Sequence, residues 1–259
     1  MAKRGSGVVL LPGVVMPAAL AYGPLLDALG DEVDPLAKDL ELYAGDTPPP
    51  GYAVDFEIDG LLSAAEEAGF ERFHLVGYSG GGAVSLAFAA RHPERLRSLA
   101  LIEPAWDGNW ELSPAEEMLW RRFEELADVD PAEEEPMAEF MRMQLWPGVE
   151  PPAPPPGPEP PWMAKRPAGI RALIAAFRDG GIDPERLRAF ERPVYFALGS
   201  LSNPDYWAHM AERLGRTFGD FTLEVYEGRH HLDPPHRAEP QRFAASLLSH
   251  WARAEAAGT

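Results

Sequence analysis

Short runs of apolar residues alternate with amphipathic stretches through the first 103 residues. Continuous apolar runs are typical of strands buried on both faces, whereas a period of about 3.6 residues is typical of helices that cover a sheet. Strands are predicted over 8–11, 73–77 and 96–102, and more weakly over 40–43. Helices are predicted over 18–29, 55–68 and 80–91. Regular alternation of strand and helix predicts a mainly parallel sheet with helices on both faces.

The same pattern returns after residue 192. It predicts strands over 194–198 and 221–226 and helices over 205–214 and 240–254. The two parts together predict one α/β sheet of about six strands. We therefore assign 1–103 and 193–259 to a single core domain. A chain of 259 residues is long enough for one such domain with an inserted segment.

Residues 104–192 have a different pattern, without a convincing strand. Helices are predicted near 114–126, 136–145, 168–178 and 184–190. Nine prolines lie between Pro147 and Pro161, and proline cannot donate the backbone hydrogen bonds of a helix or sheet. The segment is thus predicted to be a helical cap inserted between two core strands, with a Pro-rich loop over 147–161.

Composition excludes several classes of protein. The formal net charge of −18 argues against a nucleic-acid partner and against docking on an anionic membrane. There is no cysteine, so thiolate catalysis and cysteine-ligated metals are excluded. No apolar run approaches the roughly 18 residues of a membrane span, and the run 8–11 is too short for a signal peptide. We predict a cytoplasmic protein that needs no metal or cofactor.

The negative charge is concentrated in one segment. From Glu103 to Glu150 there are 14 acidic residues and three arginines. A negative entrance formed by this segment would repel anionic substrates. Charge runs of this kind are also common on solvated helix faces.

A nucleophile motif lies between a predicted strand and a predicted helix. Residues 77–81 read Gly-Tyr-Ser-Gly-Gly and fit G-x-S-x-G. In that context the serine of the motif occupies a sharp turn, and the flanking glycines leave room for strand and helix to approach. Ser79 is therefore the predicted nucleophile, at the carboxyl edge of the sheet.

A serine nucleophile needs a base, and seven histidines are available. The region Gly228–His236 follows the last predicted strand and precedes the last helix, so it also lies at the carboxyl edge. His231 is the preferred base, with His230 and His236 as alternatives. A metal site built from this cluster is disfavoured by its spacing.

A third group should orient the imidazole. Glu103 is the first residue after the strand 96–102, on the same edge as Ser79. No acid occupies the positions directly after Gly199, and Asp205 is the alternative to Glu103.

The loop after the first strand, 12–16, is the predicted source of a second oxyanion donor. We assign the oxyanion hole to the backbone N–H groups of Val14 and Gly80. Met16, Tyr78 and Trp106 flank the predicted site in sequence and are assigned to substrate binding.

These residues resemble the α/β-hydrolase superfamily. Residues 77–84 followed by 91–102 are similar to that superfamily's elbow, helix and next strand, and 228–251 resembles its histidine loop and terminal helix. The resemblance covers roughly 1–103 and 193–255. Two departures are Pro12, where the family usually carries histidine, and the missing acid after Gly199, although some members place the acid where Glu103 stands.

The resemblance implies an acyl-enzyme mechanism on Ser79 without a cofactor. Tryptophan and methionine in the cap favour carboxylic esters of small to medium apolar substrates. The alternatives are another reaction on the same fold (lactone or carbon–carbon hydrolysis, cofactor-free peroxidation, acyl transfer) or a ligand receptor that retains the triad. The sequence predicts a small-molecule partner and leaves the oligomeric state open.

Overall fold

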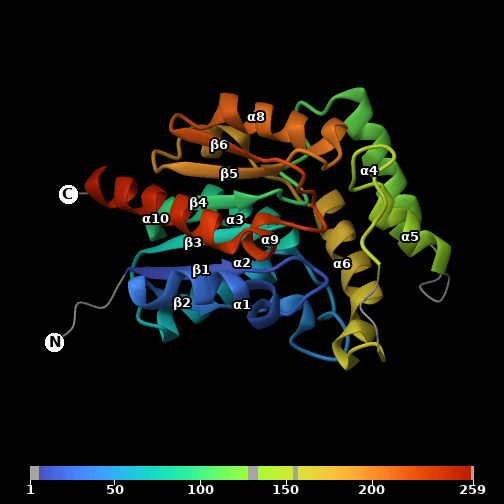
Figure 1. Ribbon diagram of the computed structural model, residues 1–259, viewed down its shortest axis with the longest axis horizontal. Helices are drawn as coiled ribbons and strands as arrows, with labels where there is room; N and C mark the ends of the chain where they lie inside the picture. The colour runs from blue at the N-terminus through green and yellow to red at the C-terminus, as the bar shows by residue number, and fades with distance from the viewer. Residues whose placement is uncertain (1–5, 128–133, 154–156, 258–259) are drawn as a thin grey trace.

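The molecule is built on one parallel sheet, seen in a computed structural model that describes residues 6–127, 134–153 and 157–257. The six strands are ordered β2-β1-β3-β4-β5-β6 (Figure 1). They are β1 (Gly7–Leu11), β2 (Asp34–Ala37), β3 (Phe73–Tyr78), β4 (Leu96–Ile102), β5 (Val194–Gly199) and β6 (Phe221–Tyr226). Every neighbouring pair is parallel, which confirms the predicted fold class.

Helices cover both faces of the sheet. On one face lie α1 (Ala18–Leu29), α9 (Pro235–Ala238) and α10 (Pro240–Ala257), and on the other α2 (Val54–Glu67) and α3 (Gly80–Arg91), with α8 (His209–Thr217) beside β6. Alternate residues of β1 serve the two sides, since Val8 and Leu10 pack under α1 and α10 while Val9 and Leu11 pack under α2 and α3. This period of two gives the sheet two apolar cores.

The strand predicted at 40–43 is wrong. Residues Glu41–Tyr43 form a 3₁₀ turn whose first amides, of Glu41 and Leu42, donate to the Glu57 carboxylate at 2.8 Å. The second strand is β2, which pairs only with β1. Its sequence, Asp-Pro-Leu-Ala, has no apolar run, because an edge strand is half-exposed and tolerates proline.

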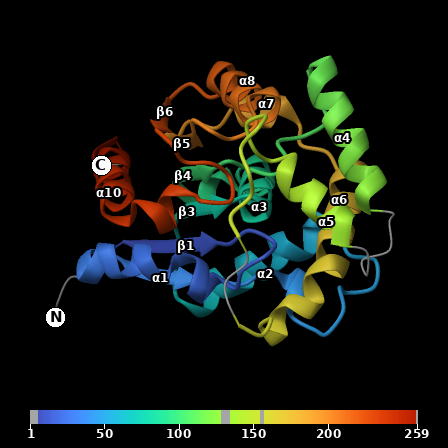
Figure 2. The ribbon, with the colours of Figure 1, turned by 45° about the vertical axis from the view of Figure 1, so that its right-hand side comes forward.

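Between β4 and β5 the chain forms a group of helices. They are α4 (Pro114–Ala127), α5 (Glu134–Arg142), α6 (Arg166–Asp179) and α7 (Pro184–Arg188), with a 3₁₀ turn at Pro161–Lys165. All four predicted helices are present, with shifted ends. In Figures 1 and 2, α4, α5 and α6 stand beyond the carboxyl ends of the strands.

The Pro-rich loop predicted at 147–161 is only partly described. Residues 154–156 lie outside the described part of the chain, and the described residues from 147 to 160 form neither helix nor strand. Within the described residues, no helix combines the length and the apolar character that a membrane crossing requires.

Buried histidines give the fold a predicted sensitivity to acid. His250 on α10 is 4% exposed, neither ring nitrogen has a hydrogen-bond partner, and burial lowers its pKa to about 3. Below the unfolded-state pKa of about 6.5 the unfolded chain takes up a proton that the folded protein excludes, so stability falls as the pH falls.

We expect the native protein to lose about 2 kcal/mol more unfolding free energy between pH 7 and pH 5 than the His250→Gln variant. Urea unfolding at the two pH values measures the difference. Equal losses in both proteins would mean that His250 is already protonated in the folded state at pH 5.

Candidate active site

Ser79 occupies a strained turn between β3 and α3. Its φ is +51°, a region that L-residues rarely adopt. The glycines on either side make this turn possible, because a Cβ on Gly81 would collide with the carbonyl oxygens of Leu11 and Pro12, and one on Gly77 with the Gly81 carbonyl. This is the strand–turn–helix context that the G-x-S-x-G interpretation required.

The structure brings Ser79, His231 and Glu103 together. His231 Nε2 lies 3.0 Å from Ser79 Oγ, and His231 Nδ1 lies 2.9 Å from Glu103 Oε2. Ser79 is 7% exposed and the other two side chains are 2% exposed. The three groups form a continuous hydrogen-bonded chain from a hydroxyl through an imidazole to a carboxylate, shielded from bulk water.

Glu103 is held from its other side by the turn that follows β5. Its Oε1 accepts hydrogen bonds from the Gly199 amide at 2.7 Å and the Ser202 hydroxyl at 2.5 Å. Like Ser79, Glu103 has a positive φ, +43°. The carboxylate thus leaves the end of β4 and reaches across to the end of β5, where the sequence has no acid. Asp205, the alternative acid, has an exposed side chain, and its backbone amide donates a hydrogen bond to Asn203 Oδ1 at the start of a helix.

Two aromatic rings enclose the His231 imidazole. The Trp207 indole stacks on it with ring centroids 4.1 Å apart and an interplanar angle of 15°, and the Tyr78 ring lies 5.1 Å away. The Trp207 indole N–H donates to the Pro104 carbonyl at 3.0 Å, beside Glu103, and the Tyr78 hydroxyl donates to the His231 carbonyl. The indole face is therefore placed to orient the imidazole and to stabilise it when protonated.

We expect Trp207→Leu to lower kcat/KM for an ester about 10- to 30-fold, since a desolvated cation–π contact contributes about 2 kcal/mol. The charged and titratable neighbours of His231, which are Glu103, His230 and Asp233, are unchanged in the variant.

Trp207→Phe, which keeps an aromatic face, is the matched control and should show a smaller loss of kcat/KM. Equal losses of kcat/KM in Trp207→Leu and Trp207→Phe would assign Trp207 to packing alone.

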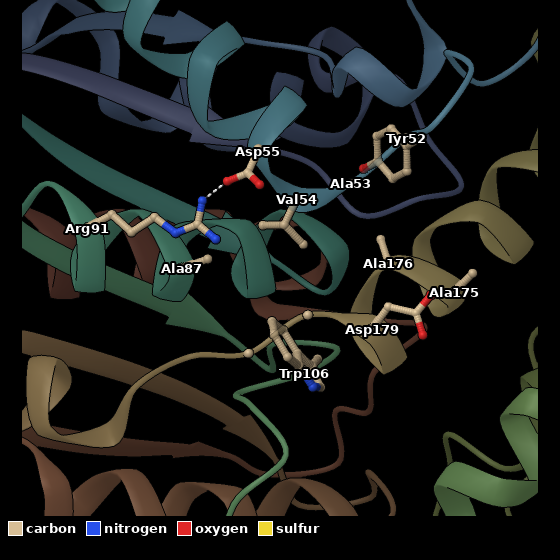
Figure 3. Close-up of a pocket in the computed structure, with 12 residues that line it drawn as sticks. Tyr52, Ala53, Val54, Asp55, Ala87, Arg91, Trp106, Ala175, Ala176 and Asp179 are labelled. Carbon is tan, nitrogen blue, oxygen red and sulfur yellow. Dashed lines mark ion pairs between the residues drawn. The ribbon is translucent and has the colours of Figure 1, made fainter.

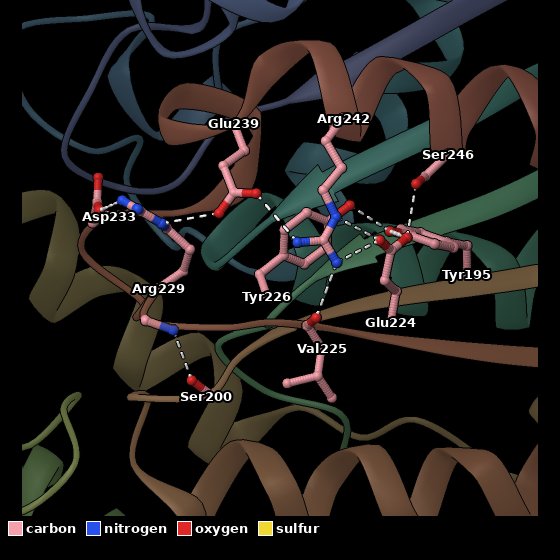
Figure 4. A network of polar contacts seen from close by, with 11 residues as sticks. Tyr195, Ser200, Glu224, Val225, Tyr226, Arg229, Asp233, Glu239, Arg242 and Ser246 are labelled. Atoms are coloured by element: carbon pink, nitrogen blue, oxygen red, sulfur yellow. Dashed lines mark hydrogen bonds and ion pairs between the residues drawn. The ribbon is translucent and has the colours of Figure 1, made fainter.

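Salt bridges hold the loop that carries His231. Arg229 pairs with Asp233 at 2.6 Å and with Glu239 at 3.0 Å, and the Ser200 hydroxyl accepts from the Gly228 amide (Figure 4). Arg242 continues this network to Glu224 on β6 (Figure 4). The loop is thereby attached to β5, β6 and α10, so its histidine has a defined position.

The other histidines of the cluster are placed differently. His236 is fully buried, 4.9 Å from the rings of both Tyr22 and Tyr78, and burial holds its pKa well below the usual range. His230 pairs through its backbone with Asp233. Among the residues that the structure describes, no three His, Asp or Glu side chains are grouped to share a metal ion.

The predicted oxyanion loop lies against the start of α3. A Cβ on Gly80 would lie 3.8 Å from the Val14 nitrogen, and one on Gly13 3.2 Å from Ser79 Cβ. Within the described chain, neither the Val14 nor the Gly80 amide donates a hydrogen bond. An oxyanion site needs N–H groups that are not already bonded, and the assignment of Val14 and Gly80 to this role stays a prediction.

The residues assigned to substrate binding lie in different surroundings. Met16 packs against the core under α1, together with Tyr78. Trp106 is 1% exposed, stacks on Phe177 of α6, and lines a cavity of about 280 Å³ between α2, α3 and α6 (Figure 3). Arg91 and Asp55 form an ion pair at that cavity, and neither Ser79 nor His231 lines it. Substrate contact by Met16, Tyr78 and Trp106 stays a prediction.

Sequence reasoning missed Ser202, Trp207 and Arg166. Ser202 and Trp207 follow β5, so the sequence could have placed them at the carboxyl edge. Nothing in the sequence indicates which of the residues after a strand points towards the site. Arg166 carried no motif; its burial depends on contacts with residues more than 120 positions earlier.

Comparisons with known proteins identify the family of the chain. A family model described as the alpha/beta hydrolase family matches residues 8–246. Fluoroacetate dehalogenase from a Burkholderia species is 32% identical over 106 residues, 38% of this chain and 35% of that protein. The chain thus aligns with about two-fifths or less of the length of the curated relatives that it matches.

Two solved structures share the fold over almost the whole chain. The thermophilic esterase from Thermogutta terrifontis is 20% identical, with a TM-score of 0.69, 97% of this chain covered and 91% of that chain. The enol-lactonase from Burkholderia xenovorans LB400 is 13% identical, with a TM-score of 0.69, 96% of this chain covered and 92% of that chain. The family model spans residues 8–246, and the sheet order and the turn at Ser79 are consistent with it. This chain therefore belongs to the alpha/beta hydrolase family.

Proposed function

We propose that the protein is a serine hydrolase that cleaves carboxylic esters with small to medium apolar groups. The observation that carries the proposal is the hydrogen-bonded chain from Ser79 Oγ through His231 to Glu103, with distances of 3.0 and 2.9 Å. A serine hydroxyl becomes a competent nucleophile when an adjacent imidazole can accept its proton. The names of the relatives, a carbamate hydrolase, a dehalogenase and a deformylase, support hydrolase activity in general.

In the proposed reaction, Ser79 Oγ attacks the ester carbonyl while His231 Nε2 accepts its proton. The carbonyl oxygen becomes an oxyanion, and the N–H groups of Val14 and Gly80 stabilise it. His231 then returns the proton to the departing alcohol, which leaves an acyl-enzyme. Water, deprotonated by His231, hydrolyses this ester and regenerates Ser79.

Glu103 has an orienting and electrostatic role in this scheme. Its carboxylate accepts the Nδ1–H of His231, which fixes the tautomer that leaves Nε2 free to accept a proton. The serine nucleophile also argues against a dehalogenase reaction, which on this fold needs a carboxylate to form the alkyl ester.

The helices between β4 and β5 supply the proposed apolar wall. On α6, Leu173 is buried, and a Cβ on Gly80 would lie 2.9 Å from its Cδ2, so this side chain lies against Gly80 at the start of α3. Phe123 on α4 and Phe177 on α6 pack in the same apolar cluster. We take the segment 104–192 as a cap over the site.

Labelling with a fluorophosphonate tests the serine, and a chain-length series tests the substrate class. We expect covalent labelling of Ser79 and a maximum of kcat/KM at short to medium acyl chains. An unlabelled protein, or tight ligand binding with only a very slow single turnover, would contradict the proposal and favour the receptor alternative.

A further inference from the structure

Arg166, the first residue of α6, is a buried cation without an anionic partner. Its side chain is 5% exposed, and its guanidinium lies 3.9 Å from the centroid of the Tyr43 ring and 5.1 Å from that of Trp162. Nη1 donates a long hydrogen bond of 3.4 Å to the Val14 carbonyl, and Nε has no partner. No ion pair joins Arg166 to an Asp or Glu of the described residues.

A buried guanidinium without a carboxylate partner is unusual. A guanidinium offers five N–H donors, and removing it from water is costly unless a carboxylate or several acceptors replace the solvent. Arg213, the other arginine of the described residues that is buried to this degree, pairs with both Asp107 and Glu116, at 2.9 and 2.7 Å. Stacking on Tyr43 offsets only part of the cost for Arg166.

The Arg166 guanidinium lies close to the proposed oxyanion hole. The bonds from the nitrogen to the oxygen of one residue total about 4.2 Å, so Arg166 Nη1 lies within about 8 Å of the Val14 N–H. Two turns along the same face of α6, Leu173 stands over Gly80. One face of α6 therefore carries both Arg166, beside Val14, and Leu173, beside Gly80.

We propose that Arg166 binds a carboxylate of the substrate, which makes the preferred substrate the half-ester of a short dicarboxylic acid. The inference rests on the proposed function, keeps its ester reaction, and gives the apolar acyl chain a terminal carboxylate. A planar guanidinium pairs with a carboxylate through two parallel hydrogen bonds, and such a pair would engage Nε, the nitrogen that has no partner. With about 1.3 Å added per carbon, chains of about four to six carbons span the available distance.

The acidic segment does not conflict with this assignment. The excess of acids over 103–150 concerns the approach of an anion, and salt screens exposed charges over about 8 Å at physiological ionic strength. Arg166 is shielded from solvent, so its interaction with a bound carboxylate is screened far less.

Binding to an inactive protein tests the site without relying on catalysis. In the Ser79→Ala background, titration calorimetry with monomethyl glutarate should give an affinity at least about 30-fold higher than in Ser79→Ala/Arg166→Met. Arg178→Met in the same background is the control, because Arg178 lies on α6 but is half-exposed and pairs with Asp179. Unchanged affinity in the Arg166→Met protein, or no binding to the parent, would overturn the inference.

Turnover then tests the consequence for specificity. The ratio of kcat/KM for monomethyl glutarate to that for methyl pentanoate should exceed one in the native enzyme and fall at least about 30-fold in Arg166→Met. Arg166→Lys keeps the charge without the planar fork and should fall between them. An equal loss for both esters would assign Arg166 to holding the Val14 loop and would refute carboxylate recognition.

The two proposals fail in distinguishable ways. If methyl pentanoate is hydrolysed but the ratio does not depend on Arg166, carboxylate recognition is refuted and the esterase proposal stands. If neither ester is hydrolysed while monomethyl glutarate binds through Arg166, the esterase proposal is refuted and the carboxylate site stands.

Discussion

Replacing Ser79 with alanine is expected to reduce ester turnover by about 10⁴-fold or more, because the nucleophile of a triad cannot be substituted by its partners. His231 Nε2 would have no hydroxyl to deprotonate, since Ser79 Oγ is its hydrogen-bond partner at 3.0 Å. The change also removes the only oxygen that a fluorophosphonate would modify at this turn. Rates with p-nitrophenyl esters and intact-mass measurement after labelling provide the two readouts.

A matched serine variant makes this result specific. Ser63 is exposed on α2, and Ser63→Ala should retain labelling and turnover. The Ser79 variant should melt at or above the native temperature, because alanine keeps the turn and removes a polar group that is 7% exposed. Full labelling of Ser79→Ala, or turnover within tenfold of the native rate, would reject Ser79 as the nucleophile.

Replacing Glu103 with glutamine is expected to cost about 10³- to 10⁴-fold in kcat, for a reason visible in its three partners. The Gly199 amide and the Ser202 hydroxyl both donate to one oxygen, and His231 Nδ1 faces the other. A glutamine offers one acceptor end and one donor end. Its oxygen satisfies the two donors only if its NH₂ group faces His231.

That orientation would select the wrong tautomer of the base. An NH₂ group facing Nδ1 favours the imidazole with its proton on Nε2, which cannot accept the proton of Ser79. Asp205→Asn is the control, because Asp205 is exposed and outside this network. Near-native kcat in Glu103→Gln together with a large loss in Asp205→Asn would transfer the orienting role to Asp205.

Much of the site followed from one rule about parallel sheets. The carboxyl ends of parallel strands meet at one edge, so residues that directly follow a strand are brought together. Ser79 follows β3, Glu103 follows β4 and the loop with His231 follows β6. Local pattern was enough to place each of these residues after a strand. The edge strand β2 escaped the same reasoning because it has no apolar run.

The sequence by itself determined the parallel α/β fold, the turn at Ser79 and the set of residues at its carboxyl edge, because these depend on local pattern and chain order. The tertiary structure alone decided which side chains meet there. Only it places Trp207 on the His231 ring and Ser202 on the Glu103 carboxylate, and only it leaves Arg166 buried beside Val14. Such contacts join residues that lie far apart in sequence, and the packing of side chains decides which of them form.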